Sequence, residues 1–156
     1  MVFVCDNIIS NNESGKVVII RAKLNDQKRV YRDIAVDPFI NLYVLASYVT
    51  EAFGFGFDHC FGFFNSSDIF GKGKDSTHYE LFFDIGEEID ENTESVAKTI
   101  VQELFVANKN KWWMLFDYGD GWIFELECID DKDIDQKSGA IVKTSGDAPS
   151  QYNRFG

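Results

Sequence analysis

The chain has 156 residues, of which 45% are apolar, and it carries a formal net charge of −11 at pH 7. A chain of this size is expected to fold as one domain, residues 1–156, around a real hydrophobic core. Such an acidic surface repels phosphate groups and anionic lipid heads, which argues against direct binding of nucleic acids or membranes. No apolar run approaches the roughly 20 residues that span a bilayer, and no signal-peptide pattern opens the chain. A cytoplasmic protein is therefore expected.

The cysteines and histidines show no spacing typical of a metal site. Cys5, Cys60 and Cys128 are odd in number and form no C-x-x-C pair. This argues against a disulfide framework or a zinc ribbon and favours a reducing compartment. His59 and His78 supply no ligand pair at helical or zinc-knuckle spacing. We expect no metal and no other cofactor.

The first predicted elements are a β-hairpin and a helix. Lys16–Leu24 and Lys28–Val36 are rich in apolar and β-branched residues and are separated by a polar triplet, a pattern typical of two paired strands. Pro38 stops the second strand because proline cannot donate a hydrogen bond to a sheet. A helix then begins at Asn41, a favourable N-cap residue, and ends at Gly54. Its apolar face comprises Leu42, Leu45, Ala46, Val49 and Phe53.

Aromatic residues and glycines alternate in the next segment, which reads FGFGFDHCFGFF from Phe53 to Phe64. Two interpretations are open. The segment is either a helix end and tight connection in which glycine admits closely packed rings, or part of a ligand pocket. A short strand is expected around His59–Phe64. A polar loop follows over residues 65–76, and His78–Ile85 is predicted to form another strand.

A second helix is predicted from Thr93 or Ser95 to about Ala107. Glu94 at its start and the lysines beyond its end suit the helix dipole. Its buried stripe comprises Val96, Ala97, Ile100, Val101 and Leu104.

The last predicted unit is a hairpin of two aromatic strands, Trp112–Phe116 and Trp122–Cys128. Alternation places Glu125 and Glu127 on the solvent side of its second strand. The turn is Gly119-Asp120-Gly121, in which the Asp120 carboxylate can bind backbone amides and hold the loop. The residues predicted on the opposite, buried face are Trp112, Met114, Phe116, Trp122, Phe124, Leu126 and Cys128.

These elements together predict an α+β fold in which a mixed or antiparallel sheet of hairpins carries two packed helices. Residues 130–156 are polar and are expected to form an irregular C-terminal tail. No internal repeat is visible.

Three motifs resemble the plasmid pRiA4b open-reading-frame-three-like family, which occurs on plasmids, transposons and phages. YRDI (Tyr31–Ile34) is similar to its Trp-Arg-Arg-Ile strand, EAFGFGFDHCFGF (Glu51–Phe63) to its Ala-Phe-Gly-Trp and following His, and FDYGDGW (Phe116–Trp122) to its Tyr-Asp-Phe-Gly-Asp-x-Trp motif. The resemblance covers about residues 17–149 and implies a single α+β domain. Some members are labelled resolvase-like, but this chain lacks the serine amid arginines and the basic surface that a serine recombinase needs.

Several polar residues usual in this family are replaced in this chain. The replacements, at positions where the family has His or Gln, are Ala46, Thr50, Phe61 and Phe124. His59, Asp117 and Asp120 remain. A small hydrolase that uses His59 with Asp117 or Asp120 is the alternative function, because histidine and carboxylate are common acid–base groups. With so few of the family's polar residues present, we expect no catalytic residue and a protein that is not an enzyme.

Acidic residues form two clusters along the chain. The first comprises Asp84, Glu87, Glu88, Asp90, Glu91 and Glu94, and the second comprises Asp130, Asp131, Asp133 and Asp135. Each cluster is either a solvated loop that aids solubility or a face that mimics phosphates and competes for a basic surface.

These observations predict an acidic protein-binding protein of phage, plasmid or other mobile-element origin. We expect an inhibitor or decoy that acts on a basic nucleic-acid-handling protein, such as a defence nuclease. The predicted partner-binding residues are Glu87, Glu88, Asp90, Glu91, Phe55 and Phe57. The residues predicted to form the family motif and its turn are His59, Asp117, Gly119, Asp120 and Trp122.

Overall fold

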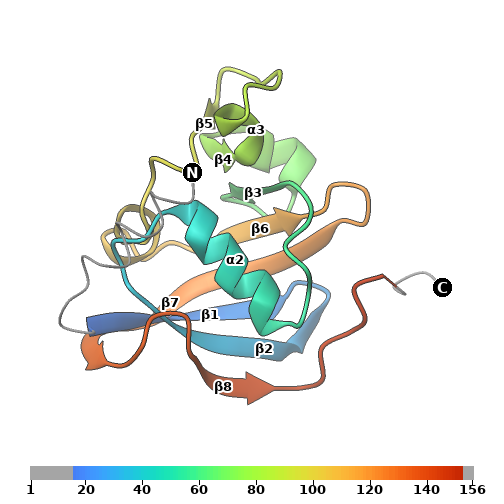
Figure 1. The fold of residues 1–156 in the computed structure, drawn as a ribbon. Coiled ribbons are helices and arrows are strands. Elements are labelled where there is room, and N and C mark those ends of the chain that lie inside the picture. The colour runs from blue at the N-terminus through green and yellow to red at the C-terminus, as the bar shows by residue number, and fades with distance from the viewer. Residues whose placement is uncertain (1–15, 153–156) are drawn as a thin grey trace.

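The computed structural model describes residues 16–152, which form an α+β fold around one sheet (Figure 1). In spatial order, the strands are β5 (Thr93–Glu94), β4 (His78–Glu80), β3 (Phe61–Phe64), β6 (Trp112–Phe116), β7 (Trp122–Asp135), β1 (Lys16–Leu24), β2 (Gln27–Val36) and β8 (Ile141–Ser145). Neighbouring strands are antiparallel except β4 and β5, which are parallel. The predicted fold class is confirmed.

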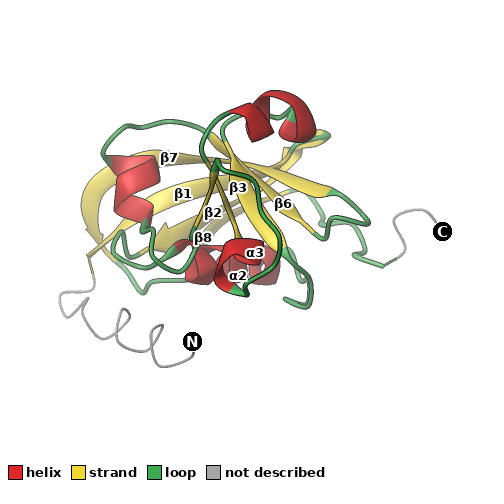
Figure 2. Cartoon of the chain, turned by 90° about the horizontal axis from the view of Figure 1, so that it is seen from above, coloured by secondary structure: helices red, strands yellow, loops and turns green. Residues whose placement is uncertain are grey.

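The helices are short, apart from the one predicted after the first hairpin. They are α2 (Leu42–Ala52), α3 (Leu81–Asp84) and the single-turn segments Ile69–Gly73 and Gln102–Val106. Figure 2 shows α2 and α3 on the same side of the strongly twisted sheet. Within residues 16–152, no helix has both the length and the apolar content that crossing a membrane requires.

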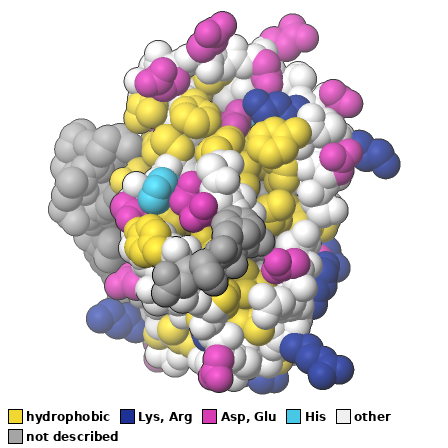
Figure 3. Space-filling model, turned by 90° about the vertical axis from the view of Figure 1, so that its right-hand side faces the viewer, with side chains coloured by type: hydrophobic (Ala, Val, Ile, Leu, Met, Phe, Trp, Pro, Cys, Tyr) yellow, Lys and Arg dark blue, Asp and Glu magenta, His cyan; other side chains and the backbone are white. Residues whose placement is uncertain are grey.

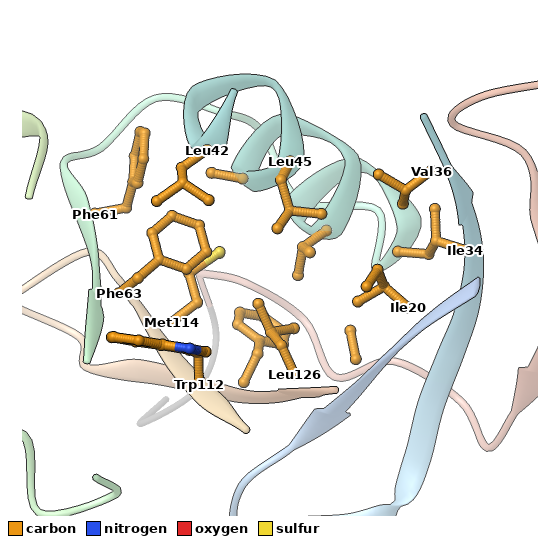
Figure 4. Close-up of a cluster of buried hydrophobic side chains, with 14 of the residues drawn as sticks. Ile20, Ile34, Val36, Leu42, Leu45, Phe61, Phe63, Trp112, Met114 and Leu126 are labelled. Atoms are coloured by element: carbon orange, nitrogen blue, oxygen red, sulfur yellow. The ribbon is translucent and has the colours of Figure 1, made fainter. Parts of the chain in front are cut away.

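The predicted first hairpin and first helix are present. Asn41 caps α2 as expected, because its Oδ1 accepts a hydrogen bond of 2.9 Å from the Val44 amide. The buried face of α2 lies over the sheet, where Figure 4 shows Leu42 and Leu45 above Phe63 and Met114. This contact forms the main core and fixes the chain that follows α2 against β3 and β6.

The prediction of a second helix, from Thr93 or Ser95 to about Ala107, is wrong for most of that range. Only Gln102–Val106 and the residue before it are helical. The preceding residues bind a neighbouring segment instead: the Leu42 amide donates to the carbonyl oxygens of Val96 and Thr99, and the Val101 amide donates to Ile40. β-Branched residues have modest helix propensity, and here tertiary hydrogen bonds take the place of helical ones. The apolar stripe is nevertheless mostly buried.

The predicted strand His78–Ile85 is also shorter than expected. β4 ends at Glu80 and the chain turns into α3. β3, its partner, has only four residues, and the ladder pairs Gly62 with Glu80 and Phe63 with Tyr79. Beyond that register only Phe61 of β3 remains as a partner for a longer β4.

The expected irregular tail, residues 130–156, is partly regular. β7 continues to Asp135 because β1 pairs with it as far as Lys16. The chain then returns as β8, which pairs with β2. Residues 153–156 of the predicted tail lie outside the described residues, as does Cys5.

The terminal hairpin has the predicted register, but one of its two solvent-facing glutamates is buried. Trp112, Phe116, Trp122 and Phe124 are buried as expected. Glu125 is only 4% exposed, whereas Glu127 is half-buried. Three lysines cover the Glu125 carboxylate, with Nζ atoms 2.6 Å away in Lys28, 3.6 Å in Lys111 and 3.8 Å in Lys23.

Candidate functional site

The aromatic and glycine segment after α2 turns toward the core before it reaches β3. Gly54 adopts φ 76°, which ends the helix in the left-handed region that glycine tolerates. The prediction that Phe55 forms part of the partner-binding surface was wrong, because Phe55 is only 5% exposed. Its ring lies 4.8 Å from the Trp122 ring and 6.2 Å from that of Phe124. The first of the two interpretations, a tight connection between packed rings, therefore describes this part of the segment.

The turn between β6 and β7 is held by Asp117. Asp117 Oδ1 accepts hydrogen bonds from the amides of Gly119, at 3.1 Å, and Asp120, at 3.2 Å. The Asp117 backbone has φ 64°, a left-handed conformation that aspartate tolerates better than most residues. The prediction that the Asp120 carboxylate holds the turn is therefore wrong, because the carboxylate that binds these amides belongs to Asp117. Gly121 follows with φ 70°, as the turn requires.

The same aspartate brings the turn to His59. The Asp117 amide donates to the Cys60 carbonyl oxygen at 2.9 Å. The two ring nitrogens of His59 each face a carboxylate: Nδ1 lies 2.7 Å from Asp58 Oδ1 and Nε2 lies 3.5 Å from Asp117 Oδ2. The structure therefore unites His59 with Asp117, two of the three polar family residues that remain. The Asp120 side chain makes no hydrogen bond or ion pair with another of residues 16–152.

Asp58 is a site residue that the sequence reasoning missed. It accepts hydrogen bonds from the Tyr152 hydroxyl and, at 3.3 Å, from Gln151 Nε2. The hydrogen bond from Tyr152 and the neighbouring His59 hold the Asp58 pKa below its ordinary value, so that this carboxyl is ionised at neutral pH. Gln151 also binds the Gly56 backbone in both directions. Pairing between residues 56–58 and 151–152 has no short-range sequence signal.

An open depression of about 320 Å³ lies beside His59. Its lining residues are Tyr43, Phe57, Asp58, His59, Cys60, Phe61 and Leu81. The Tyr43 and Phe57 rings meet edge to face, with centroids 5.2 Å apart. Burial, and next the negative charge of Glu87, raise the pKa of the Cys60 thiol, which keeps it protonated and weakly nucleophilic. Phe57, unlike Phe55, is partly accessible from solvent as predicted.

The first acidic cluster divides into bound and free carboxylates. Asp84 Oδ2 accepts from the Val96 amide at 2.9 Å. Asp90 Oδ1 accepts from the Asn92 amide at 2.9 Å and from the Thr93 hydroxyl at 3.0 Å, so this predicted partner-binding residue also shapes its own loop. The exposed members whose side chains form no hydrogen bond or ion pair with another of the described residues are Glu87, Glu88, Glu91 and Glu94, and the first three lie together in the loop over residues 87–91.

The second acidic cluster is partly engaged by basic and backbone groups. Asp131 pairs with Lys109, and Asp130 Oδ1 accepts from the Lys132 amide at 3.0 Å. The Asp133 side chain lies outside the described residues. The first cluster is therefore the stronger candidate for binding a basic surface.

A second histidine lies in a buried polar network away from the depression. His78 is fully buried, with Nε2 3.0 Å from the Thr93 hydroxyl and 3.3 Å from Glu80 Oε2. The Tyr118 hydroxyl donates to Glu80 Oε1 at 2.6 Å, and burial followed by this glutamate raises the Tyr118 pKa. These bonds connect the strand before α3 to the β6–β7 turn. Among residues 16–152, no three His, Cys, Asp or Glu side chains converge to hold a metal ion.

The comparisons with known proteins concern the family and the fold. A family model described as plasmid pRiA4b ORF-3-like protein matches residues 16–151. The fold is similar to the crystal structure of a protein of unknown function from Methanosarcina mazei Go1, with a TM-score of 0.64, 14% sequence identity, and coverage of 88% of this chain and 73% of that chain. No curated protein matches the chain.

Proposed function

The chain belongs to the plasmid pRiA4b ORF-3-like family, and we propose that it is a non-enzymatic binding protein that acts as an inhibitor or decoy on a basic nucleic-acid-handling protein. The observation that carries the proposal is the set of exposed carboxylates Glu87, Glu88 and Glu91, which form no hydrogen bond or ion pair with another of the described residues. Figure 3 shows one face of the molecule, on which acidic side chains gather at the upper end and lie beside a histidine.

Exposed carboxylates can compete with phosphates for the same basic surface. They carry the negative charge that a nucleic-acid-binding protein attracts, and their field speeds the encounter with such a protein. Carboxylates already bound to neighbouring groups, such as Asp84, contribute less to this competition. The free glutamates of the 87–91 loop need no rearrangement before they meet a cationic partner. A defence nuclease of the host is the partner class that this chemistry and a plasmid-associated family suggest.

The surroundings of His59 favour binding over catalysis. A general base needs a free nitrogen within hydrogen-bond reach of the reacting group, but both His59 nitrogens face carboxylates. Asp117 is already engaged by the turn, and the nearby Cys60 thiol is protonated. The alternative, a small hydrolase, is favoured by one observation: His59 lines a depression, and its Nε2 lies 3.5 Å from Asp117 Oδ2.

The proposal is tested by capture of a partner followed by measurement of its inhibition. The tagged full chain and a variant with Glu87, Glu88 and Glu91 changed to Gln are each used to retain proteins from a host lysate. We expect the parent to retain a basic nucleic-acid-handling protein, the Gln variant to retain much less, and the purified partner to lose nucleic-acid cleavage or binding when the parent is added. A partner that is acidic, or one whose nucleic-acid activity is unchanged, would contradict the proposal.

The hydrolase alternative has its own test. The parent and His59→Gln are incubated with chromogenic esters and phosphate esters, and turnover is followed over hours. We expect no turnover above the uncatalysed rate in either protein. Turnover by the parent that is lost in His59→Gln, with the melting temperature unchanged, would establish the alternative instead.

A further inference from the structure

We propose that the depression beside His59 binds one arginine side chain of the partner, with the guanidinium against the accessible surface of the Phe57 and Tyr43 rings and paired with Asp58. This site rests on the proposed function, since it assumes a basic protein partner. It adds to that function an anchoring contact distinct from the long-range attraction of the 87–91 loop. Interfaces commonly depend on a few such anchors, among which arginine is enriched.

The size and walls of the depression suit a single side chain. Its volume of about 320 Å³ lies at the lower end of the range for small-molecule sites. Tyr43 and Phe57, which are partly exposed, supply aromatic surface, and the buried Phe61 ring lies 5.7 Å from that of Tyr43. A cation near an aromatic ring is attracted by its quadrupole, and arginine makes this contact more often than lysine. The walls therefore favour a flat cation over a purely apolar group.

The charges around the depression select a cation. Within the part of the chain that the structure describes, no lysine or arginine lines it. The Asp58 side chain is 49% exposed. Three neighbouring donors, from His59, Gln151 and Tyr152, bind it, which leaves acceptor capacity because a carboxylate offers about four lone-pair sites. The negative charge of Glu87 also acts on the depression, since it contributes, after burial, to the raised pKa of the Cys60 thiol.

The chain already contains the same combination of groups elsewhere. The Arg21 guanidinium lies 4.2 Å from the centre of the Tyr31 ring. It also makes two hydrogen bonds with the Asp33 carboxylate, of 2.7 Å and 2.9 Å. This pairing of ring, guanidinium and carboxylate uses the planar fork of arginine, which lysine lacks. Among residues 16–152, the groups that line the depression include a ring and a carboxylate but no arginine.

The site is tested by NMR titration of the isotope-labelled full chain with arginine ethyl ester. The controls are citrulline ethyl ester, which has the same shape without the guanidinium charge, and lysine ethyl ester. We expect saturable shifts at residues 57–61, Tyr43 and Leu81 with the arginine ester, and at least tenfold weaker binding of the citrulline ester. The lysine ester is expected to bind more weakly than the arginine ester.

Three variants complete the test. Phe57→Leu removes the aromatic face and Asp58→Asn removes the charge, and each is expected to weaken binding of the arginine ester by about fivefold. Asp135→Asn, at the far end of β7, loses the same charge and is expected to bind as the parent does. Well-dispersed spectra establish that each variant is folded. If Asp58→Asn does not fold, Phe57→Leu still tests the site.

The arginine site is overturned if the shifts do not saturate, if the citrulline ester binds equally well, or if Phe57→Leu binds unchanged. These results are separate from those for the proposed function. Saturable binding of the arginine ester without any basic protein partner would support the site and contradict the function. A basic partner that depends on Glu87, Glu88 and Glu91, with no response to the arginine ester, would support the function and overturn the site.

Discussion

At the scale of single residues, Asp117 both holds the β6–β7 turn and faces His59, whereas the sequence pattern assigned the turn to Asp120. The turn itself was predictable from Gly119-Asp120-Gly121, since such residues favour tight turns. Which of the two aspartates holds it was not predictable, because both are within reach of the same amides in the linear sequence. The choice is made by the backbone: Asp117 adopts the left-handed conformation and directs its Oδ1 toward the turn.

Asp117→Ala is expected to lower the free energy of unfolding by about 2 kcal/mol. Loss of two hydrogen bonds contributes about 1 kcal/mol, and alanine in a left-handed conformation costs about 1 kcal/mol more. Urea unfolding measures the change. Asp117→Asn keeps an acceptor oxygen and is the matched control, and Asp120→Ala should remain within about 0.5 kcal/mol of the parent. A larger loss for Asp120→Ala than for Asp117→Ala would return the turn-holding role to Asp120.

Glu125→Gln is expected to lower the free energy of unfolding by about 1–2 kcal/mol at pH 7, since it removes the buried partner of partly exposed lysines. Burial raises the pKa of Glu125, but the hydrogen bond and charge of Lys28 and the charges of Lys111 and Lys23 outweigh it and lower the pKa from 4.5. A carboxyl with a lower pKa in the folded protein stabilises it above the unfolded pKa. This contribution is lost as the pH falls through the folded pKa.

Urea unfolding of the parent and Glu125→Gln across pH measures this dependence. The difference between them should be constant above about pH 5.5 and should shrink as the pH falls below the ordinary carboxyl pKa. Glu127→Gln, on the same strand and half-buried, is the control and should change stability by less than about 0.5 kcal/mol. A difference between parent and Glu125→Gln that grows toward acid pH would refute the assignment.

At the scale of elements, the polar C-terminal segment contains a strand, β8, that the pattern of apolar residues did not predict. The hairpins were visible because their apolar residues alternate, as a half-buried strand requires. β8 has exposed side chains throughout most of its length and so lacks that signal. Its position depends on partners distant in sequence: Arg32 Nη1 donates to the carbonyl oxygens of Ser145, at 3.0 Å, and Gly146, at 3.1 Å.

Arg32→Met is expected to lower the free energy of unfolding by about 2–3 kcal/mol, since it leaves several carbonyl groups without their charged donor. Arg32 Nε also donates to the Ala52 carbonyl at the end of α2, and its guanidinium lies 4.9 Å from the Phe53 ring. Hydrogen exchange should accelerate most at residues 141–146. Arg29→Met, an exposed change on the same strand, is the control. Equal acceleration across the whole sheet in Arg32→Met would contradict a local role.

The candidate site was also only partly predictable at this scale. The family motifs indicated His59 and Asp117, and the fold brings them together. The sequence did not indicate Asp58, because Gln151 and Tyr152 reach it across more than 90 residues. Nor did it separate Phe55 from Phe57: both follow a glycine, and the packing of Phe55 against Trp122 and Phe124 distinguishes them.

At the scale of the whole molecule, the net charge of −11 arises from two kinds of acidic residue, those bound to neighbouring groups and those that are not. Asp33, Asp84 and Glu125 bind neighbouring groups and stabilise the fold. Glu87, Glu88 and Glu91 make no such bond to the described residues. A count of charges cannot distinguish the two kinds, but the distinction decides which acids are free to meet a partner.

Changing Glu87, Glu88 and Glu91 to Lys should leave the fold intact, because solvated surface sites usually tolerate substitution within about 0.5 kcal/mol each. Thermal unfolding and the amide spectrum provide the measurement. The matched control is the corresponding change to Gln, which removes the charge without reversing it. Loss of the folded spectrum in both variants would show that these residues support the fold and would remove the basis for assigning them to binding.

The most direct test of the central claim is the salt dependence of binding to the captured partner. The dissociation constant is measured at several salt concentrations for the parent and for the variant with Glu87, Glu88 and Glu91 changed to Gln. We expect the parent's affinity to fall steeply as salt rises and the Gln variant to bind more weakly at low salt, with the two converging at high salt because screening removes the same charges' contribution. Equal affinity of the two proteins at low salt, or a parent affinity that does not change with salt, would contradict the account.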